Sequence, residues 1–364
     1  MKPTVCSPDD LWRLLPRALS GEATLLPVPH PGDAAVMRPD VPVTEPGAAV
    51  IVTTSGSTGT PKGVVLSRDA LLASARATRT RLGGPMHWYS PLPRHYVAGL
   101  MVLVRAFDAG TDPVLLAPDL ADLPSADRDG PRALSIVPTQ LHRALDDAEL
   151  TARMAAFDAV LLGGAPARPD LLARAAAAGI RVVTTYGMSE TCGGCVYDGV
   201  PLEGVGVALD QDTGRISLAG PILFSGYRLA PDLTAETLVN GRLVTRDRGA
   251  WVEGRLQVLG RIDDVVISGG VNVDLAEVQR RLTAIDQHPG IVLGVPDAEW
   301  GARIVLVTES PDDDLGGWRD RLAATGLDRP ALPRQVIAVV RLPRTSSGKI
   351  DRQALIEAAN AGTA

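Results

Sequence analysis

The chain has 364 residues, a formal net charge of −6 and a sequence pI of about 5.5, and hydrophobic residues make up 45% of it. An acidic chain lacks the basic face that a nucleic-acid partner requires, and no apolar run approaches the ~20 residues that cross a bilayer. Length and composition therefore predict a globular cytoplasmic protein with two domains, no nucleic-acid partner and no membrane insertion.

The first part of the chain alternates short apolar runs with amphipathic segments. Strands are expected at residues 48–55, 110–117, 132–138, 157–164 and 180–187, and helices at residues 68–82, 139–150 and 168–179. This alternation is typical of parallel sheets with helices packed against them.

The pattern changes twice after residue 200. Short β runs broken by glycine between residues 200 and 260 indicate antiparallel strands in a small β-barrel-like part. Helices and strands then alternate in a compact α+β unit of about a hundred residues. We therefore predict an α/β fold in two domains. Residues 1–260 form a large N-terminal domain of mostly parallel sheets with packed helices, and residues 261–364 form a small α+β C-terminal domain on a hinge.

The stretch TTSGSTGTPKGVV, from Thr53 to Val65, is suited to bind phosphates. Its glycines let the backbone approach a ligand, its hydroxyl groups can bond to phosphate oxygens, and Lys62 adds a positive charge. It is not a Walker A loop, because Pro61 stands where the second glycine belongs and Gly63 follows the lysine. The apolar run that comes next predicts a strand, with a helix beginning only after the N-cap candidate Ser67.

Two other patterns carry less weight. Cys192 and Cys195 form a C-x-x-C, but no second pair completes a zinc site, so we interpret them as small residues in a glycine-rich stretch rather than a redox pair. The stretch from Gly187 to Thr191 approaches the G-x-S-x-G nucleophile elbow and lacks its last glycine, which disfavours a hydrolase.

Several stretches, in this order along the chain, resemble the motifs of adenylate-forming enzymes, the family of acyl-CoA ligases, peptide-synthetase adenylation domains and luciferases. They are TSGSTGTPKGVVLS from Thr54, LLGGAPA from Leu161, TTYGMSETCGG from Thr184, VTRDRGAW from Val244, GRIDDVVISGGVNVDLAEVQ from Gly260 and LPRTSSGKIDR from Leu342. The resemblance implies a reaction in which ATP and Mg²⁺ activate a carboxylic acid as an acyl-adenylate, and coenzyme A then accepts the acyl group.

The resemblance also implies which residues hold the nucleotide. They are Thr54, Ser55, Gly56, Ser57, Thr58, Gly59 and Lys62 in the phosphate loop, Gly163, Gly164 and Ala165 beside adenine, Thr185, Tyr186, Gly187 and Ser189 at the base and the α-phosphate, and Asp247 and Arg261 at the ribose. Glu190 would hold Mg²⁺, because a carboxylate is tolerable beside a triphosphate only with a hard cation between them.

Further roles are implied for the C-terminal domain. Lys349 follows a Ser-Ser-Gly turn and would be the catalytic lysine of adenylate formation, whereas an exposed lysine near a C-terminus is usually only solvated. Asp263 would be the hinge residue about which the small domain turns, and Gly269 and Gly270 would then approach the thiol. Asp274 is expected to cap the next helix, with Glu277 completing a capping box.

The acid pocket is predicted from the stretch SPLPRHYVAGL, which begins at Ser90. His95 would be a gate or an orienting side chain, the alternative being a histidine packed at a helix start. The stretch from Thr185 to Val205 resembles the 2-succinylbenzoate–CoA ligases of menaquinone synthesis, which implies 2-succinylbenzoate as the acid. Its aromatic carboxylate would need a donor or cation, for which the candidates are Arg94, His95, Gly193 and Gly194.

Other interpretations stay open at this point. An aryl or medium-chain acyl-CoA ligase shares every motif, and a stand-alone carrier-loading adenylation domain shares the first step. A non-catalytic adenylate-binding protein is disfavoured by the presence of Lys349 and Glu190. Only about fifty residues precede the phosphate loop, fewer than in most relatives, so part of the usual N-terminal subdomain is expected to be missing. A homodimer is compatible with the resemblance.

Overall fold

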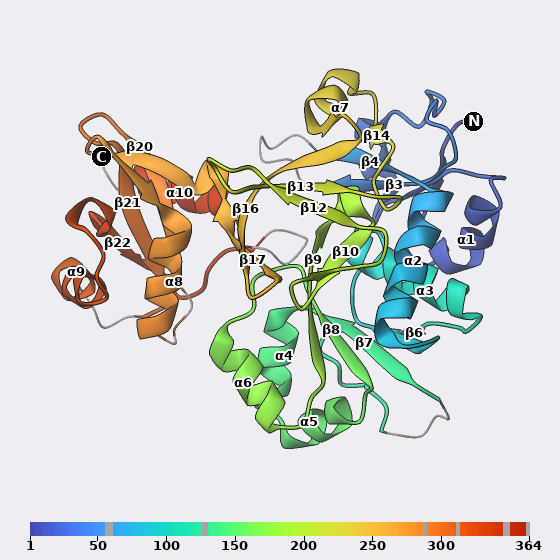
Figure 1. Ribbon diagram of the computed structural model, residues 1–364, viewed down its shortest axis with the longest axis horizontal. Helices are drawn as coiled ribbons and strands as arrows, with labels where there is room; N and C mark the ends of the chain where they lie inside the picture. Colours follow the sequence, from blue (N-terminus) through green and yellow to red (C-terminus); the bar gives the residue numbers. More distant parts are fainter. Residues whose placement is uncertain are drawn as a thin grey trace. The chain divides into compact units, whose positions relative to one another are not determined.

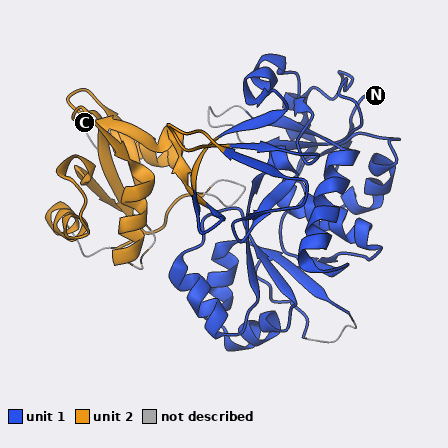
Figure 2. Cartoon of the chain, in the orientation of Figure 1, with its two compact units in different colours: residues 1–208, 217–245, 251–256 blue, residues 209–216, 246–250, 257–364 orange. Residues whose placement is uncertain are grey.

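The computed structural model describes residues 1–54, 61–125, 130–286, 288, 290–310, 314–344 and 350–361. The chain divides into two compact units (Figure 2). Unit 1 comprises Met1–Ala208, Ser217–Thr245 and Trp251–Leu256, and unit 2 comprises Leu209–Ile216, Arg246–Ala250 and Gln257–Ala364. Most of unit 2 thus follows Leu256, near the predicted domain boundary. Rotation of the C-terminal domain about Asp263 stays a prediction.

A five-stranded sheet in unit 1 carries the predicted phosphate loop (Figure 1). Its order is β1 (Thr4–Cys6), β2 (Leu25–Pro27), β3 (Ala48–Thr54), β4 (Lys62–Ser67) and β14 (Gly226–Tyr227). The first three strands are parallel, and β4 is antiparallel to both of its neighbours. Buried apolar residues of these strands pack under the short helix η1 (Pro31–Met37), with helix α1 (Leu11–Leu19) also beside the sheet.

A seven-stranded sheet forms the centre of unit 1. Its order is β11 (Val200–Pro201), β10 (Gly193–Tyr197), β9 (Val182–Met188), β8 (Ala159–Leu162), β7 (Arg132–Ile136), β5 (His87–Ser90) and β6 (Val114–Leu115). The five strands from β9 to β6 run parallel, β10 runs antiparallel to this group, and β11 is antiparallel to β10. The central strands β7 and β8 are apolar and buried along their whole length, as expected for a sheet covered on both faces. The α/β prediction is confirmed.

Helices cover both faces of this sheet (Figure 1). Helices α2 (Arg68–Leu82) and α3 (Val97–Ala109) pack on one face, and α4 (Pro138–Ala144), α5 (Ala148–Ala155) and α6 (Pro169–Ala177) on the other. The predicted start of α2 is confirmed, because the Ser67 hydroxyl accepts a hydrogen bond from the Ala70 amide at 3.1 Å. Among the described residues, no helix is both long and apolar enough to cross a membrane.

Short strands fill the region after residue 200, as expected. The sheet order is β12 (Gly206–Leu209), β13 (Arg215–Ala219), β16 (Arg242–Val252) and β15 (Leu238–Val239), and β17 (Arg255–Arg261) pairs with β16. Helix α7 (Pro231–Thr237) precedes β15. The division between the two units runs through these strands, so the ends of β16 belong to unit 1 and its middle to unit 2.

Unit 2 is the predicted α+β part. Its sheet has the order β19 (Val271–Asp274), β18 (Val265–Ser268), β21 (Gly301–Thr308) and β20 (Gly290–Asp297), with β22 (Gln335–Ala338) parallel to β21. Helices α8 (Leu275–Ile285) and α9 (Leu315–Ala324) bury one face of the sheet, and α10 (Arg352–Ala361) buries the other. Short helices η3 (Ile262–Asp264) and η4 (Arg329–Ala331) complete the unit.

The start of α8 confirms one prediction and corrects another. The Asp274 carboxylate caps the helix by accepting the Ala276 amide at 3.0 Å. The predicted capping box is wrong, because the carboxylate of Glu277 accepts hydrogen bonds from Arg280 and Arg281. Two guanidinium groups one turn ahead are stronger partners for a carboxylate than a single backbone amide.

Candidate active site

The predicted binding residues of unit 1 follow the carboxyl ends of its parallel strands. His95 comes after β5, Gly163 to Ala165 come after β8, and Tyr186 to Glu190 lie at the end of β9. Because these strands run parallel, their carboxyl ends share one edge of the sheet. That edge is where open α/β sheets bind ligands.

The turn after β8 approaches β9 too closely for a side chain. A Cβ atom on Gly163 would overlap the hydroxyl oxygen of Thr185, which donates a hydrogen bond to the Leu162 carbonyl oxygen at 3.3 Å. Gly164 and Ala165 are exposed at this turn, and Tyr186 is half-buried. The exposed backbone of the turn can therefore contact a flat ligand such as a base.

Hydrogen bonds of a buried threonine hold the turn that carries Ser189 and Glu190. The buried Thr191 hydroxyl accepts the Met188 amide at 2.9 Å and donates to the Gly193 carbonyl oxygen at 2.7 Å. A Cβ atom on Gly187 would overlap that same carbonyl oxygen, so only glycine fits there. The turn η2 (Ser189–Thr191) thus presents two half-buried polar side chains in a fixed orientation.

The two cysteines of this hairpin are packing residues. Cys192 and Cys195 are free and fully buried, and burial raises the pKa of Cys195 to about 12. Burial also raises the pKa of Cys192, so neither thiol supplies a thiolate at neutral pH. Among the described residues, no group of three or more His, Cys, Asp and Glu side chains could hold a metal on its own.

One tyrosine contacts both Glu190 and Lys62. The Tyr227 hydroxyl donates a hydrogen bond to Glu190 Oε1 at 2.7 Å, and Lys62 Nζ lies 5.5 Å from the centre of the same ring. Tyr227 is 7% exposed, and the Phe224 ring packs against its edge with the ring centres 4.9 Å apart. The sequence motifs did not single out Tyr227, which lies in a two-residue strand far from both partners in sequence.

The described ends of the phosphate loop agree with the sequence argument. Thr54 and Lys62 form the last pair of the antiparallel strands β3 and β4, and the Thr54 hydroxyl donates to the Lys62 carbonyl oxygen at 3.4 Å. A strand rather than a helix therefore follows the lysine, which confirms that this is not a Walker A loop. The predicted residues Ser55, Gly56, Ser57, Thr58 and Gly59, and Lys349, lie outside the described residues.

The predicted acid-pocket residues Arg94 and His95 differ in their surroundings. Arg94 forms an ion pair with Asp9 near the N-terminus, so its charge is already engaged. His95 is half-buried, and no described residue forms a hydrogen bond with its Nδ1. Burial lowers the pKa of His95 despite the opposing charge of Asp33, and the Arg94 charge lowers it further. The imidazole is therefore neutral at pH 7.

A buried arginine lies beside the two pocket glycines, and sequence reasoning missed it. Arg105 is 6% exposed, donates from Nη2 to the Tyr197 hydroxyl at 3.2 Å and lies 5.1 Å from the Trp88 ring centre. A Cβ atom on Gly193 would be 4.0 Å from Arg105 Nη2. Among the described residues, Arg105 has no carboxylate partner and its Nε has no hydrogen bond.

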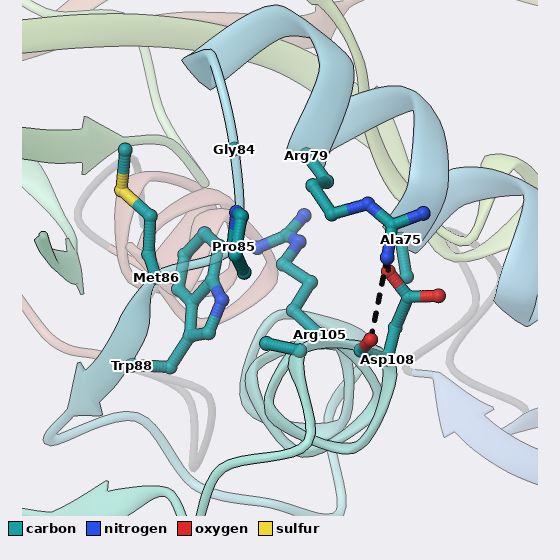
Figure 3. Close-up of a pocket in the computed structure, with 9 residues that line it drawn as sticks. Ala75, Arg79, Gly84, Pro85, Met86, Trp88, Arg105 and Asp108 are labelled. Carbon is teal, nitrogen blue, oxygen red and sulfur yellow. Dashed lines mark hydrogen bonds and ion pairs between the residues drawn. The ribbon is translucent and has the colours of Figure 1, made fainter.

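Arg105 also lines a small hollow between α2 and α3 (Figure 3). Trp88 and Arg79 line this hollow as well. Arg79 differs from Arg105, because its guanidinium pairs with Asp108 at 3.0 Å. Among the described residues, Arg79 therefore has a carboxylate partner and Arg105 has none.

The predicted ribose residues lie together within unit 2. Arg261 donates to Asp263 through Nε and Nη2, both at 2.9 Å, and lies 3.9 Å from an oxygen of Asp247. Burial would raise the pKa of Asp263, but the Arg261 hydrogen bonds and the charges of Arg261 and Arg246 lower it overall. The predicted hinge residue is thus ion-paired to Arg261 and Arg246.

The glycine pair of unit 2 forms the turn between β18 and β19. Gly269 and Gly270 have φ angles of 59° and 79°, a region that favours glycine. A Cβ atom on Gly269 would be 3.0 Å from the Trp300 ring, whose face is covered by the Arg334 guanidinium at 3.5 Å. Trp300 and Arg334, which no motif indicated, therefore fix one side of this turn.

Comparison with known proteins agrees with this arrangement. The family model described as AMP-binding enzyme matches residues 13–246, well over half of the chain. The chain belongs to the AMP-binding enzyme family. The predicted family is therefore confirmed.

Relatives within the AMP-binding enzyme family carry more specific names. A protein of Mycobacterium tuberculosis named probable 2-succinylbenzoate–CoA ligase is 44% identical over 328 residues, which cover 85% of this chain and 84% of the relative. A 2-succinylbenzoate–CoA ligase of Enterococcus faecalis is 31% identical over 332 residues, covering 83% of this chain and 68% of the relative. The fold matches o-succinylbenzoate CoA synthetase of Bacillus subtilis in complex with the acyl-adenylate intermediate OSB-AMP, with 26% identity, a TM-score of 0.75, and coverage of 94% of this chain and 80% of that one.

Proposed function

We propose that this chain is an AMP-forming acid–CoA ligase that activates 2-succinylbenzoate as its acyl-adenylate and then transfers the acyl group to CoA, a step in menaquinone biosynthesis. The acid is taken from the names of the relatives. One structural observation supports the reaction type: Glu190 and Lys62 are held around the Tyr227 ring, at the site predicted to bind ATP phosphates. In a metal–triphosphate complex, the carboxylate can bind the metal ion and the ammonium group can bind the phosphates.

The first step must overcome charge repulsion. A carboxylate oxygen of the acid attacks the α-phosphorus of ATP, a new P–O bond forms, and pyrophosphate leaves. Lys62 is the proposed cation at the departing phosphates, and Lys349 is the proposed cation between the acid and the α-phosphate. Such preorganised charges act by electrostatic stabilisation rather than by covalent chemistry.

Mg²⁺ fits the residues at this turn. The cation usually binds proteins through one or two carboxylates and completes its shell with water and substrate phosphates. Glu190 supplies one carboxylate. Its Oε1 accepts a hydrogen bond from the Tyr227 hydroxyl, and no described residue forms a hydrogen bond with its Oε2. Bound there, Mg²⁺ would neutralise part of the triphosphate charge. Glu190 is therefore its proposed ligand.

In the second step the CoA sulfur attacks the acyl carbon, AMP leaves and the thiol loses its proton. Gly269 and Gly270 are the proposed neighbours of the thiol in this step. The neutral imidazole of His95 would adjoin the acid without adding a charge of its own. Asp247 and Arg261 are the proposed ribose contacts, since a carboxylate can accept hydrogen bonds from both ribose hydroxyls.

The aromatic carboxylate of 2-succinylbenzoate has a better candidate partner than Arg94. A buried guanidinium without a counter-ion is costly, and an anionic ligand beside Gly193 would offset that cost. Arg105 is such a group, whereas Arg94 already pairs with Asp9. We therefore assign the aromatic carboxylate to Arg105.

Replacing Arg105 with leucine should raise the KM for 2-succinylbenzoate by ~100-fold, because a charged hydrogen bond to the ligand is lost. The KM for 4-oxo-4-phenylbutanoate, which lacks the aromatic carboxylate, should change little. Arg79→Gln is the matched control, since Arg79 lines the same hollow but already pairs with Asp108. A similar rise for both acids would mean that Arg105 is only structural.

A coupled assay tests the assignment of the acid. Protein, ATP, Mg²⁺ and CoA are supplied with 2-succinylbenzoate or with a panel of aryl and medium-chain acids, and the thioester is measured by mass spectrometry. We expect kcat/KM to be highest for 2-succinylbenzoate. A higher value for another acid would favour an acyl-CoA ligase of different specificity. Adenylate formation without transfer to free CoA would favour a carrier-loading domain.

A further inference from the structure

We propose that Tyr227 is a positioning residue that keeps Glu190 and Lys62 apart and aims each of them at the metal–nucleotide complex. The inference rests on the proposed function, because it concerns how that site is assembled. It adds a residue that none of the sequence motifs contains.

Tyr227 contacts two opposite charges through different parts of its side chain. The Tyr227 hydroxyl donates to Glu190 Oε1 at 2.7 Å, while Lys62 Nζ lies 5.5 Å from the ring centre. In the part of the chain that the structure describes, Lys62 and Glu190 form no ion pair with each other. A direct pair would neutralise both side chains, so neither would attract a phosphate or a cation. The tyrosine instead gives each charge a neutral partner.

The hydroxyl also decides which oxygen of Glu190 is presented. A carboxylate has two oxygens, and Tyr227 binds Oε1. The other oxygen, Oε2, is then the one turned to a ligand. Without the hydroxyl, the carboxylate could rotate freely. Binding of Mg²⁺ would then cost the conformational entropy of fixing the Glu190 side chain.

Strand pairing and hydrogen bonds hold the backbone around Tyr227 in place, so the position of its side chain is well defined. Tyr227 pairs with Val64 of β4, two residues from Lys62, and its amide donates to the Thr234 hydroxyl at 2.8 Å. The next residue, Arg228, is buried, and its amide donates to the Gly63 carbonyl oxygen at 2.7 Å. Its guanidinium donates to backbone carbonyl oxygens between Met37 and Pro42, at 3.2 Å for Met37 and 2.9 Å for Pro42.

Binding of ATP in the presence and absence of Mg²⁺ tests this role without any acid. Calorimetry should show that Mg²⁺ strengthens ATP binding to the wild-type protein. In Tyr227→Phe, which keeps the ring beside Lys62 and loses only the hydroxyl, this strengthening should fall by ~10-fold, the loss expected for one charge-assisted hydrogen bond. Tyr227→Leu removes the ring as well and should also weaken ATP binding without Mg²⁺, because Lys62 can then pair with Glu190.

Tyr89→Phe is the matched control, because Tyr89 is a buried tyrosine of the same unit whose hydroxyl has no hydrogen-bond partner among the described residues. It should keep the wild-type response to Mg²⁺. The inference is overturned if Tyr227→Phe keeps the full strengthening by Mg²⁺. It is also overturned if that variant loses thioester formation from supplied acyl-adenylate as severely as adenylate formation, since that would indicate a general structural defect.

The proposed function is tested separately. If the wild-type protein shows Mg²⁺-dependent ATP binding that Tyr227→Phe loses, yet never forms a thioester from 2-succinylbenzoate, the role of Tyr227 stands and the assigned substrate fails. If the wild-type protein forms the thioester and both proteins respond equally to Mg²⁺, the proposed function stands and the role of Tyr227 fails.

Discussion

Replacing Lys349 with alanine is expected to slow acyl-adenylate formation by ~10²–10³, while thioester formation from supplied acyl-adenylate stays close to the wild-type rate. The carboxylate and the α-phosphate are both anionic, so a cation between them matters most in the first step. In the second step a thiol attacks an acyl group that is already activated, and that charge is no longer required. Separate rapid-quench measurements of the two half-reactions provide the check.

The sequence offers a matched control for this lysine. Lys2, Lys62 and Lys349 are the three lysines of the chain, against a total of 36 lysines and arginines. Lys2 is exposed and lies outside every motif, so Lys2→Ala should leave both half-reactions unchanged. An equal loss of both half-reactions in Lys349→Ala would contradict the role assigned to Lys349.

The second large effect is expected at Glu190. Glu190→Gln keeps the shape of the side chain and an oxygen that can accept the Tyr227 hydroxyl, but it removes the negative charge that would bind Mg²⁺. Adenylate formation should fall by ~10²–10³, and the Mg²⁺ concentration for half-maximal rate should rise. Measuring the adenylation rate over a range of Mg²⁺ concentrations separates the two effects.

Glu203→Gln is the control, because Glu203 is an exposed glutamate of the same unit outside the motifs. It should match the wild-type protein at every Mg²⁺ concentration. A Glu190→Gln variant with normal Mg²⁺ dependence would show that Glu190 is not a metal ligand, whatever happens to its maximal rate.

Much of the fold could be predicted because local signals were strong. The apolar run of β8 is buried along its whole length, and Ser67 caps α2 as its position suggested. The strand β14 could not be predicted, since Gly226 and Tyr227 are strand residues only because β4 lies beside them. Glu277 shows a similar limit: the spacing suited a capping box, and two neighbouring arginines competed for the carboxylate.

The residues of the candidate site also fall into two groups, those within sequence motifs and those outside them. Tyr186 and Glu190 lie in one contiguous motif, so the sequence alone could single them out as candidates. Tyr227 and Arg105 could not be singled out, because their proposed roles depend on partners that are distant in sequence: Glu190 for the first, and Tyr197 and Gly193 for the second. For Arg105, one weak signal existed, namely a charged residue that follows an unbroken apolar run in helix α3.

Exchange of labelled pyrophosphate into ATP tests the central claim most directly, because only a reversible transfer of AMP to an acid produces it. With ATP, Mg²⁺ and 2-succinylbenzoate, we expect exchange that depends on the acid, and after CoA is added one AMP for each thioester formed. Absence of exchange with every organic acid offered, or release of ADP in place of AMP, would contradict the account.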